Sequence, residues 1–275
     1  MATIPKRVEE RLISGIKRFQ PILVSAKSRD VNESDTVVIV ADILADVFGY
    51  DKYSEVTSEF SIRGTYCDIA LKLDGKVRVL IEVKAIGLEL KENHLKQAVD
   101  YATNLGVDWV VLTNGIKWRI YKVVFSKPIE QELVAEFEFP SLVPKADPTL
   151  ELLFLLTKEG WAKSAVAAYH AQKQALSRFF IGAILTSDSV LAVVRRELKR
   201  ISPGVHIALE QINEVLINEV VKREVIEGER FHEARRTIAR VANKPLRVLK
   251  TDGGPAIISP QPTEDQAGAV EPPKA

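Results

Sequence analysis

The stretch DIALKLDGKVRVLIEVK, which runs from Asp68 to Lys84, decides the fold of this chain. Its second half alternates in character, with apolar residues at every other position on one side and Glu82 and Lys84 on the other side. The pair Asp74-Gly75 at its centre is typical of a tight turn. We therefore predict two neighbouring antiparallel strands, 66–73 and 77–85.

The length of this turn decides whether Asp68 and Glu82 lie on the same face of the sheet. A two-residue turn at Asp74-Gly75 would pair positions whose numbers sum to 149, which puts the two acids on opposite faces. A three-residue loop gives an even sum and turns both acids to one face. The sequence Leu73-Asp74-Gly75-Lys76 suits a type I turn followed by a left-handed glycine, so we predict the three-residue loop.

The flanking sequence predicts further helices and strands. An apolar stripe and the N-cap residue Asn32 indicate a helix that ends before Gly49. Asn114-Gly115 marks a second hairpin, and Gly106 ends a helix that crosses between strands. The predicted helices are 5–19, 32–47 and 91–104, with an extended stretch at 21–26. The predicted additional strands are 53–62, 107–113 and 117–123.

The strand signal vanishes after a proline-punctuated linker at 140–148. The order of elements predicts an α/β fold with a mixed sheet, then a small all-α region and a disordered tail that holds six of the thirteen prolines. The predicted divisions are an N-terminal helix with an extended lead-in (1–30), a sheet domain (31–139), a helical domain (149–242) and a proline-rich tail (243–275).

Composition restricts the possible functions. The chain has 275 residues, a formal net charge of +1 and one cysteine, Cys67, which excludes an internal disulfide and a multi-thiolate zinc site. No apolar run reaches the ~18 residues that span a bilayer, and no secretory signal precedes the first helix. A cytoplasmic protein without a membrane partner is expected. The stretch 222–250 is basic, and a solvated helix face is its simplest interpretation.

Asp68, Glu82 and Lys84 together suit phosphodiester hydrolysis. A divalent cation such as Mg²⁺ is held by a few carboxylates and keeps several waters, and carboxylates on neighbouring strands can supply them. A nearby ammonium can orient a nucleophile or neutralise the transition state. An Asp, a gap and Glu-x-Lys also occur by chance in many chains, so three exposed residues on the wet face of a sheet are the competing interpretation.

The surrounding motifs favour the functional interpretation. Gln97 and Tyr101 lie one turn apart on the crossover helix, and two later segments, WVVLTNG (109–115) and WRIY (118–121), complete the order of motifs. From about Asn32 to Val123 the sequence resembles the nuclease domain at the N-terminus of type I restriction enzyme R subunits. That family belongs to the PD-(D/E)XK superfamily, so the resemblance implies a restriction-endonuclease-like core.

The resemblance also implies roles for individual residues. Asp68, Glu82 and Val83 would bind Mg²⁺ or Mn²⁺, and Lys84 would be catalytic. Three further residues match the family: Glu33, an early helix acid, and the pair Gln97 and Tyr101. Asp68, Glu82, Glu33 and Gln97 would join Lys84 as catalytic residues, and Tyr101 would contact nucleic acid. A helix-dipole role for Glu33 and a half-buried core role for Tyr101 remain open. Cys67 stands where the family usually has proline.

The function expected from the resemblance is metal-dependent DNA cleavage in restriction, defence or repair. The chain has no P-loop sequence, so ATP-driven movement would need a separate restriction, motor or repair subunit. A homodimer would supply the two sites that a duplex cut requires. The alternative is a catalytically silent nucleic-acid-binding or assembly protein that keeps the nuclease fold. His94, near the start of the crossover helix, is expected to have a surface or capping role.

Overall fold

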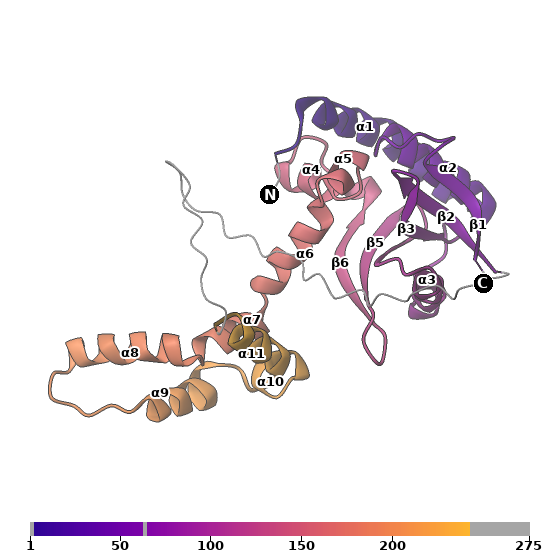
Figure 1. The fold of residues 1–275 in the computed structure, drawn as a ribbon. Coiled ribbons are helices and arrows are strands. Elements are labelled where there is room, and N and C mark those ends of the chain that lie inside the picture. Colours follow the sequence, from indigo (N-terminus) through magenta and orange to yellow (C-terminus); the bar gives the residue numbers. More distant parts are fainter. Residues whose placement is uncertain (1–2, 63–64, 243–275) are drawn as a thin grey trace, which may run out of the picture. The chain divides into compact units, whose positions relative to one another are not determined.

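The computed structural model describes residues 3–62 and 65–242 (Figure 1). The chain divides into two compact units, Met1–Ser177 and Arg178–Ala275. The first contains a six-stranded sheet with its covering helices, and the described part of the second consists of helices. The predicted α/β core followed by an all-α region is confirmed. The predicted tail, 243–275, lies outside the described residues.

The sheet is mixed, with its strands in sequence order from β1 to β6. All neighbouring strands are antiparallel except β3 and β4, which are parallel and are joined by the crossover helix α3 (Glu92–Leu105). A parallel pair requires such a crossover, because a short turn cannot return the chain to the same end. The strands are β1 (Val56–Ile62), β2 (Thr65–Leu73), β3 (Lys76–Val83), β4 (Trp109–Thr113), β5 (Lys117–Val124) and β6 (Glu130–Glu138).

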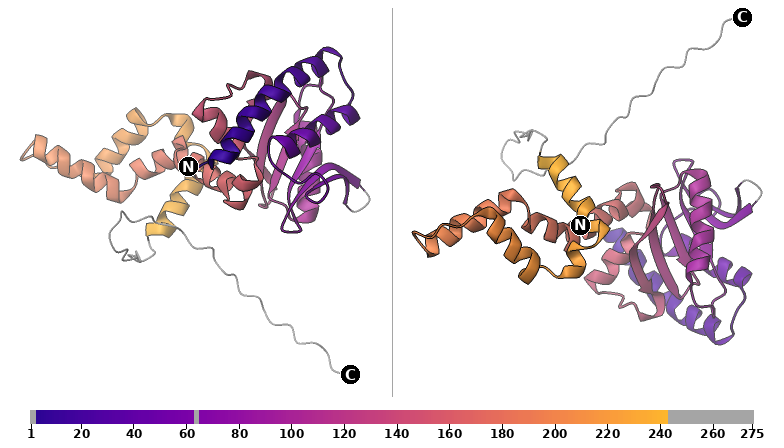
Figure 2. Two further views of the ribbon diagram at one scale, coloured as in Figure 1. Left: turned by 90° about the horizontal axis from the view of Figure 1, so that it is seen from above. Right: turned by 90° about the horizontal axis from the view of Figure 1, so that it is seen from below.

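Helices cover both faces of the sheet (Figures 1 and 2). On one face, α1 (Lys6–Ser28) and α2 (Glu33–Asp46) share a core with Val79, Ile81 and Val83 of β3. On the other face, α3 packs against a second core that contains Leu80. The alternation predicted for β3 therefore holds from Val79 to Val83, and it places Glu82 on the α3 side of the sheet.

The β2–β3 hairpin has a two-residue turn, so the predicted three-residue loop is wrong. Asp74 and Gly75 both have positive φ values, 51° and 73°, and Leu73 lies opposite Lys76. This geometry matches the twist of the flanking strands, which is why Asp-Gly favours it. A bulge follows at Arg78, because Lys72 pairs with Val77 whereas Leu71 pairs with Val79. Beyond the bulge the paired numbers sum to 150.

Helix α1 is longer than predicted, and the extended stretch 21–26 is wrong. The helix continues through Pro21 to Ser28, and Leu23 and Ala26 are fully buried on the face that already contains Phe19. Proline inside a helix costs about 3 kcal/mol. Burial of Leu23 alone contributes about 1.5–3 kcal/mol, and Ala26 adds to it, so packing offsets the cost. Pro21 itself is exposed.

The ends of α2 and α3 follow the sequence signals. The Asn32 side chain accepts a hydrogen bond from the Asp35 amide at 2.9 Å and caps α2, as predicted. Gly49 follows this helix with a φ of 83°, and Gly106 ends α3 with a φ of 67°. Only glycine adopts these left-handed conformations without a steric cost, so both glycines stop their helices.

Strand β6 was not predicted, and the segment after it is not a free linker. Its alternation is broken by a bulge where Ile120 pairs with Ala135 and Tyr121 pairs with Leu133. The short helix η1 (Phe139–Ser141) follows directly. The Gln20 side chain of α1 donates to the carbonyl oxygens of Pro140 and Leu142 at 3.1 and 2.8 Å, so this segment is fixed against the sheet unit.

Three helices after the predicted linker belong to the first unit. They are α4 (Asp147–Phe154), α5 (Lys158–Ala162) and α6 (Ala165–Ala175). Leu150, Leu153 and Val166 are buried in the same core as α1 and α2. The boundary between the units therefore lies between Ser177 and Arg178, not at the linker, because the apolar stripe of α4 completes the core beneath the sheet.

The second unit is small and helical. Its core contains Ala183, Val225, Phe231 and Ala234. Three arginines of the basic stretch, at positions 235, 236 and 240, are exposed on its last helix, in agreement with a solvated helix face. The helices are α7 (Arg178–Leu185), α8 (Asp188–Ile201), α9 (Leu209–Val215), η2 (Leu216–Val220), α10 (Arg223–Ile226) and α11 (Glu229–Ala242). In the described residues of both units, every helix is too short or too polar to cross a membrane.

Candidate active site

Asp68 and Glu82 lie on one face of neighbouring strands. Ile69 pairs with Ile81 just beyond the bulge, and continuation of this register places Asp68 opposite Glu82. A regular strand after a two-residue turn would have put the acids on opposite faces. The extra residue at Arg78 restores the even sum, so the predicted juxtaposition is reached by a different route from the predicted loop.

The Asp68 carboxylate is held by the main chain of the next strand. Its Oδ2 atom accepts a hydrogen bond from the Val83 amide at 2.7 Å. Burial raises the pKa of Asp68 above its ordinary value of 3.8, and the negative charges of Glu33 and Glu59 act in the same direction. The Val83 amide and the positive charge of Lys84 oppose this rise. The carboxylate is therefore fixed in orientation but costly to ionise.

Glu82 is the most buried acid of the site, with 1% of its surface exposed. Its Oε1 atom accepts a hydrogen bond from Lys84 Nζ at 2.6 Å, whereas its Oε2 atom is buried and has no hydrogen-bond partner. Burial raises the pKa of Glu82 to about 7, although the hydrogen bond from Lys84 lowers it. An unsatisfied buried carboxylate oxygen is costly, and a bound cation would satisfy it.

Lys84 lies between two acids from different elements. Its Nζ atom is 2.6 Å from Glu82 Oε1 and 3.6 Å from Glu33 Oε1. Burial alone would lower the pKa of Lys84, but the hydrogen bond and attraction of Glu82 and the charge of Glu33 raise it above its ordinary value. The lysine is therefore a cation. Glu33 reaches it from the first turn of α2, next to the Asn32 cap.

The other predicted residues are arranged differently. Gln97 is exposed, and its amide donates to the Tyr101 hydroxyl at 3.0 Å, so these two side chains are paired with each other. Tyr101 is half-buried and packs against the α3-side core, which agrees with the core role left open for it. No hydrogen bond or ion pair in the described residues joins Gln97 to the acids. His94 accepts a hydrogen bond from the Lys91 amide and caps α3, as predicted.

Sequence reasoning missed Glu59 as a neighbour of the site. Ser58 pairs with Ile69 and Phe60 pairs with Cys67, so Glu59 lies opposite Asp68. Its φ of 48° is rare for a residue other than glycine inside a strand. No sequence pattern predicts a glutamate with a positive φ. Glu59 could have been found only as the residue opposite Asp68, and that requires the register between β1 and β2 to be known.

The sequence predicted Asn114 only as a turn residue, but its side chain also holds the segment that follows Lys84 in place. Its amide donates to the carbonyl oxygens of Ile86 and Leu88 at 3.3 and 2.8 Å. Its side-chain oxygen accepts from the amides of Ile116 and Lys117. Asn114 is buried, so it links the exit of β3 firmly to the β4–β5 turn.

Cys67 lies beside Asp68 and is fully buried. Its thiol contacts the carbonyl oxygens of Ile69 and Ile81 at 3.5 and 3.4 Å. Burial raises the pKa of the thiol to about 12, and the charge of Glu82 adds to the effect. Burial and a raised pKa both disfavour the thiolate, so the thiol is poorly suited to act as a nucleophile or a metal ligand.

The donor set suits a cation that needs few protein ligands. In residues 3–62 and 65–242, no three histidine, cysteine, aspartate or glutamate side chains gather in an arrangement that could hold a metal ion. Mg²⁺ is commonly bound through one or two carboxylates together with waters and substrate phosphates. Asp68, with one fixed carboxylate, and Glu82, with one unpartnered oxygen, match that need.

Comparison with known proteins agrees with this architecture. Residues 38–137 match a family described as the type I restriction enzyme R protein N terminus (HSDR_N). Searches of curated proteins and of solved structures gave no match. The matched segment contains Asp68, Glu82 and Lys84, while Glu33 precedes it. Residues 38–137, which lie in the sheet unit, are therefore similar to the N-terminal domain of type I restriction enzyme R proteins, in agreement with the expected nuclease-like core.

Proposed function

We propose that the protein is a metal-dependent endonuclease that hydrolyses DNA phosphodiester bonds with Mg²⁺ or Mn²⁺. The observation that carries the proposal is the pair Asp68 and Glu82, face to face across two strands, with the Glu82 Oε2 atom buried and unpartnered and Lys84 beside them. Buried, partly uncompensated charge is expensive, and it persists most often where function requires it. The match of residues 38–137 to the type I restriction enzyme R N-terminus supports the same activity.

Asp68 and Glu82 would hold the cation, with the main-chain carbonyl of Val83 as the third atom that the family likeness implies. When bound, the cation would polarise the phosphodiester and lower the pKa of an attacking water. The Val83 amide keeps the Asp68 carboxylate in one orientation. Glu82 must be ionised to bind, and because its pKa is about 7 this happens near neutral pH.

Lys84 would provide the second positive charge of the site. The acids Glu82 and Glu33 hold its ammonium group at 2.6 and 3.6 Å from their carboxylates, so it needs little rearrangement to face a phosphate. A preorganised cation stabilises the extra negative charge that develops in the transition state. Glu33 is then a positioning residue that acts through Lys84.

The match of residues 38–137 to the type I restriction enzyme R N-terminus supports DNA as the substrate, and a separate restriction, motor or repair subunit as the partner. One active site cuts one strand, so cleavage of a duplex would require a homodimer or two successive nicks. In the described part of the chain, the site gathers four acids, Asp68, Glu82, Glu33 and Glu59, around one lysine, Lys84, so a bound cation would also reduce repulsion of the DNA phosphates.

The test is plasmid cleavage by the full chain with Mg²⁺ or Mn²⁺. We expect nicking or linearisation that chelator abolishes and that Lys84→Ala lowers at least about a hundredfold, because the variant removes the charge beside the phosphate. Lys96→Ala, on the exposed side of α3, is the matched control and should cleave normally. Equal cleavage by the Lys84→Ala and Lys96→Ala variants would rule out the assigned site.

A second function is binding without turnover. The observation that favours it is the short Lys84–Glu82 hydrogen bond, which occupies one of the oxygens that a cation would use. A protein of this kind would shift DNA in a gel, with or without chelator, and would leave every duplex and single-stranded substrate uncut. Well-folded protein that gives this result would establish the binding function in place of the nuclease.

A further inference from the structure

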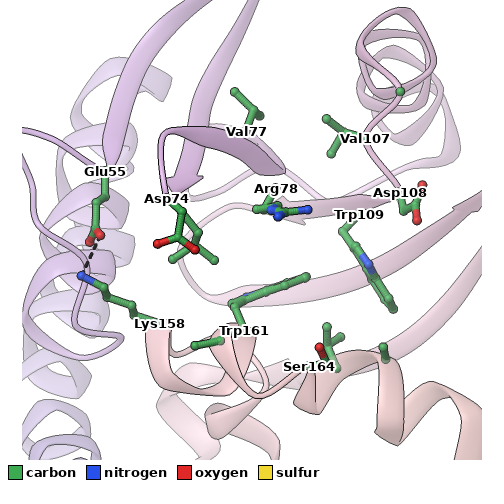
Figure 3. A pocket seen from close by; sticks show the side chains of 15 residues that line it. Glu55, Asp74, Val77, Arg78, Val107, Asp108, Trp109, Lys158, Trp161 and Ser164 are labelled. Carbon is green, nitrogen blue, oxygen red and sulfur yellow. Dashed lines mark ion pairs between the residues drawn. The ribbon is translucent and has the colours of Figure 1, made fainter. Parts of the chain in front are cut away.

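A second hollow lies at the end of β3 opposite to the acids. It has a volume of about 510 Å³, within the range of pockets that hold small molecules. The β2–β3 turn, the first residues of β3 and β4, and helices α5 and α6 form its walls (Figure 3). All of these elements belong to the first unit. The residues that matter for the inference are Asp74, Arg78, Asp108, Trp109 and Trp161.

Two indole rings form a corner of this cavity. The Trp109 and Trp161 rings are 5.6 Å apart between centroids and meet at 77°. The Lys122 ammonium lies 5.5 Å from the Trp109 centroid and uses one face of that ring. Indole faces bind flat rings well, because stacking buries a large area at little cost in side-chain freedom. The Trp109 ring is buried and also meets His170 edge to face, at 6.2 Å between centroids, so the half-buried Trp161 ring is the one that a planar ligand can stack against.

Three charged residues of the cavity, Arg78, Asp74 and Asp108, are exposed at its rim and have no partner among the described residues. In the described part of the chain, the Arg78 guanidinium and the carboxylates of Asp74 and Asp108 make no hydrogen bond or ion pair with another residue. In contrast, the remaining charges, Lys158 and Glu55, are joined by an ion pair of 2.6 Å. Figure 3 shows Arg78 across the hollow from the Trp161 ring, with Asp74 and Asp108 on either side of it.

These free groups define a complementary ligand. A guanidinium donates two parallel hydrogen bonds, so it matches a ring edge with two adjacent acceptors. A carboxylate accepts from an edge with adjacent N–H donors. Guanine carries both edges, with O6 and N7 acceptors on one and ring and amino N–H groups on another, whereas adenine offers a donor beside its N7 acceptor. Cytosine and uracil are smaller and lack the O6/N7 edge.

We propose that this cavity binds a guanine-type base, with its acceptor edge at Arg78, its donor edge at Asp108 or Asp74, and its ring against Trp161. The cavity holds two cationic side chains, Arg78 and Lys158, and three acidic ones, Glu55, Asp74 and Asp108. This balance disfavours added phosphates, so the nucleoside binds better than the nucleotide. The base comes either from a free nucleoside or from a nucleic-acid strand.

The test is a fluorescence titration of the full chain in buffer without divalent cations, so that it does not depend on cleavage. Two of the three tryptophans line the cavity, and the third, Trp118, is fully buried in the core. We expect guanosine to quench the emission at concentrations at least tenfold below those of adenosine, cytidine and uridine, and below that of guanosine monophosphate. Equal quenching by all four nucleosides, or none, would overturn the proposal.

Variants locate the binding. Arg78→Lys keeps the positive charge but loses the two parallel N–H donors of the guanidinium, so it should weaken guanosine binding about tenfold or more. Asp108→Asn and Asp74→Asn, which are isosteric, identify the acid that faces the donor edge, since that variant loses selectivity for guanosine. Arg196→Lys, in the second unit, is the matched control, and thermal unfolding of each variant checks its fold. Unchanged binding in a folded Arg78→Lys variant would contradict the assigned contact.

Two oligonucleotides separate the sources of the base. A thymidine oligomer with one central guanosine and a pure thymidine oligomer are titrated in the same way. Quenching by guanosine and by the guanosine-containing oligomer alone assigns the cavity to a base within a strand. Quenching by guanosine and by neither oligomer assigns it to the free nucleoside. Quenching by oligomers without quenching by guanosine would refute a base pocket.

Discussion

Glu82 keeps a proton to a higher pH than an ordinary glutamate does. Its folded-state pKa is about 7 and its ordinary value is 4.5, so the unfolded chain loses this proton first as the pH rises. Stability attributed to this group is therefore complete below about pH 4.5 and is lost as the pH rises to about 7. Above pH 7 the Glu82 carboxylate of the folded protein is ionised and buried, which lowers the free energy of unfolding relative to low pH.

Replacement of Glu82 by glutamine should therefore stabilise the protein at high pH. We expect Glu82→Gln to raise the free energy of unfolding by about 1–3 kcal/mol more at pH 8 than at pH 4, because glutamine does not titrate. Denaturant unfolding followed by tryptophan fluorescence measures this difference. Glu10→Gln, an exposed position on α1, is the control. An equal effect of Glu82→Gln at both pH values would contradict the argument.

At the scale of elements, the β2–β3 hairpin combines a two-residue turn with a bulge. The turn sets a register in which Asp68 and Glu82 would not lie opposite each other, and the bulge shifts that register by one residue. An odd number of residues, 69–81, separates Asp68 from Glu82, so a regular hairpin with a two-residue turn cannot place them opposite each other. The bulge at Arg78 absorbs the extra residue. Bulges often occur beside active sites, where they redirect side chains without loss of the strand pairing.

Deletion of Arg78 should leave the acids in place. The shortened hairpin would be regular, with Leu71 still opposite Val79 and Asp68 still opposite Glu82. We expect plasmid cleavage within about tenfold of the native rate, since strand pairing sets the register. Deletion of both Arg78 and Val79 is the contrasting variant, because it shifts the acids to opposite faces and should abolish cleavage. Loss of cleavage in both folded variants would show that the bulge itself is required.

Local signals in the sequence were enough to predict most elements of the sheet unit. Caps at Asn32, Gly49 and Gly106 marked helix ends correctly, because they depend on backbone conformations that few residues adopt. Pro21 misled the prediction of α1, since the energy that overrides it comes from Leu23 packing against distant residues. Strand β6 was missed because its bulge disrupts the alternation on which strand prediction depends.

The candidate site was predictable in its residues but not in its detail. Asp68, Glu82 and Lys84 follow from alternation and motif order, and the structure brings them together with Glu33. The Glu82 Oε2 atom lacks a hydrogen-bond partner because the side chain is buried among residues from several elements. Such burial results from side-chain packing across elements, which no local sequence pattern encodes.

At the scale of the whole molecule, the chain consists of two units with separate cores. The core of the first unit includes α4, α5 and part of α6, well beyond the predicted linker. The core of the second has few buried residues, and several of its apolar side chains, such as Ile201 and Val220, are exposed. A core this small stabilises a fold only weakly.

Residues 1–177 should therefore fold alone. We expect this fragment to unfold in one cooperative transition close to the main transition of the full chain, because its core is complete without residues beyond Ser177. Calorimetry of both proteins makes the comparison. A fragment 1–148, which lacks α4 to α6, is the control and should be aggregated or unfolded. A fragment 1–177 without a cooperative transition would mean that the units depend on each other.

The position of Cys67 gives the protein its own reporter of local opening. It is the single thiol of the chain, and burial together with a pKa raised to about 12 protects it twice from alkylating reagents, which react with the exposed thiolate. The rate at which intact protein gains the mass of one label therefore measures how often the strand that carries Asp68 separates from its neighbours. A divalent cation held by Asp68 and Glu82 would bind only the closed form, so labelling should slow as its concentration rises. Mass spectrometry of the labelled protein would thus measure cation occupancy of the site without nucleic acid and without cleavage of a phosphodiester bond.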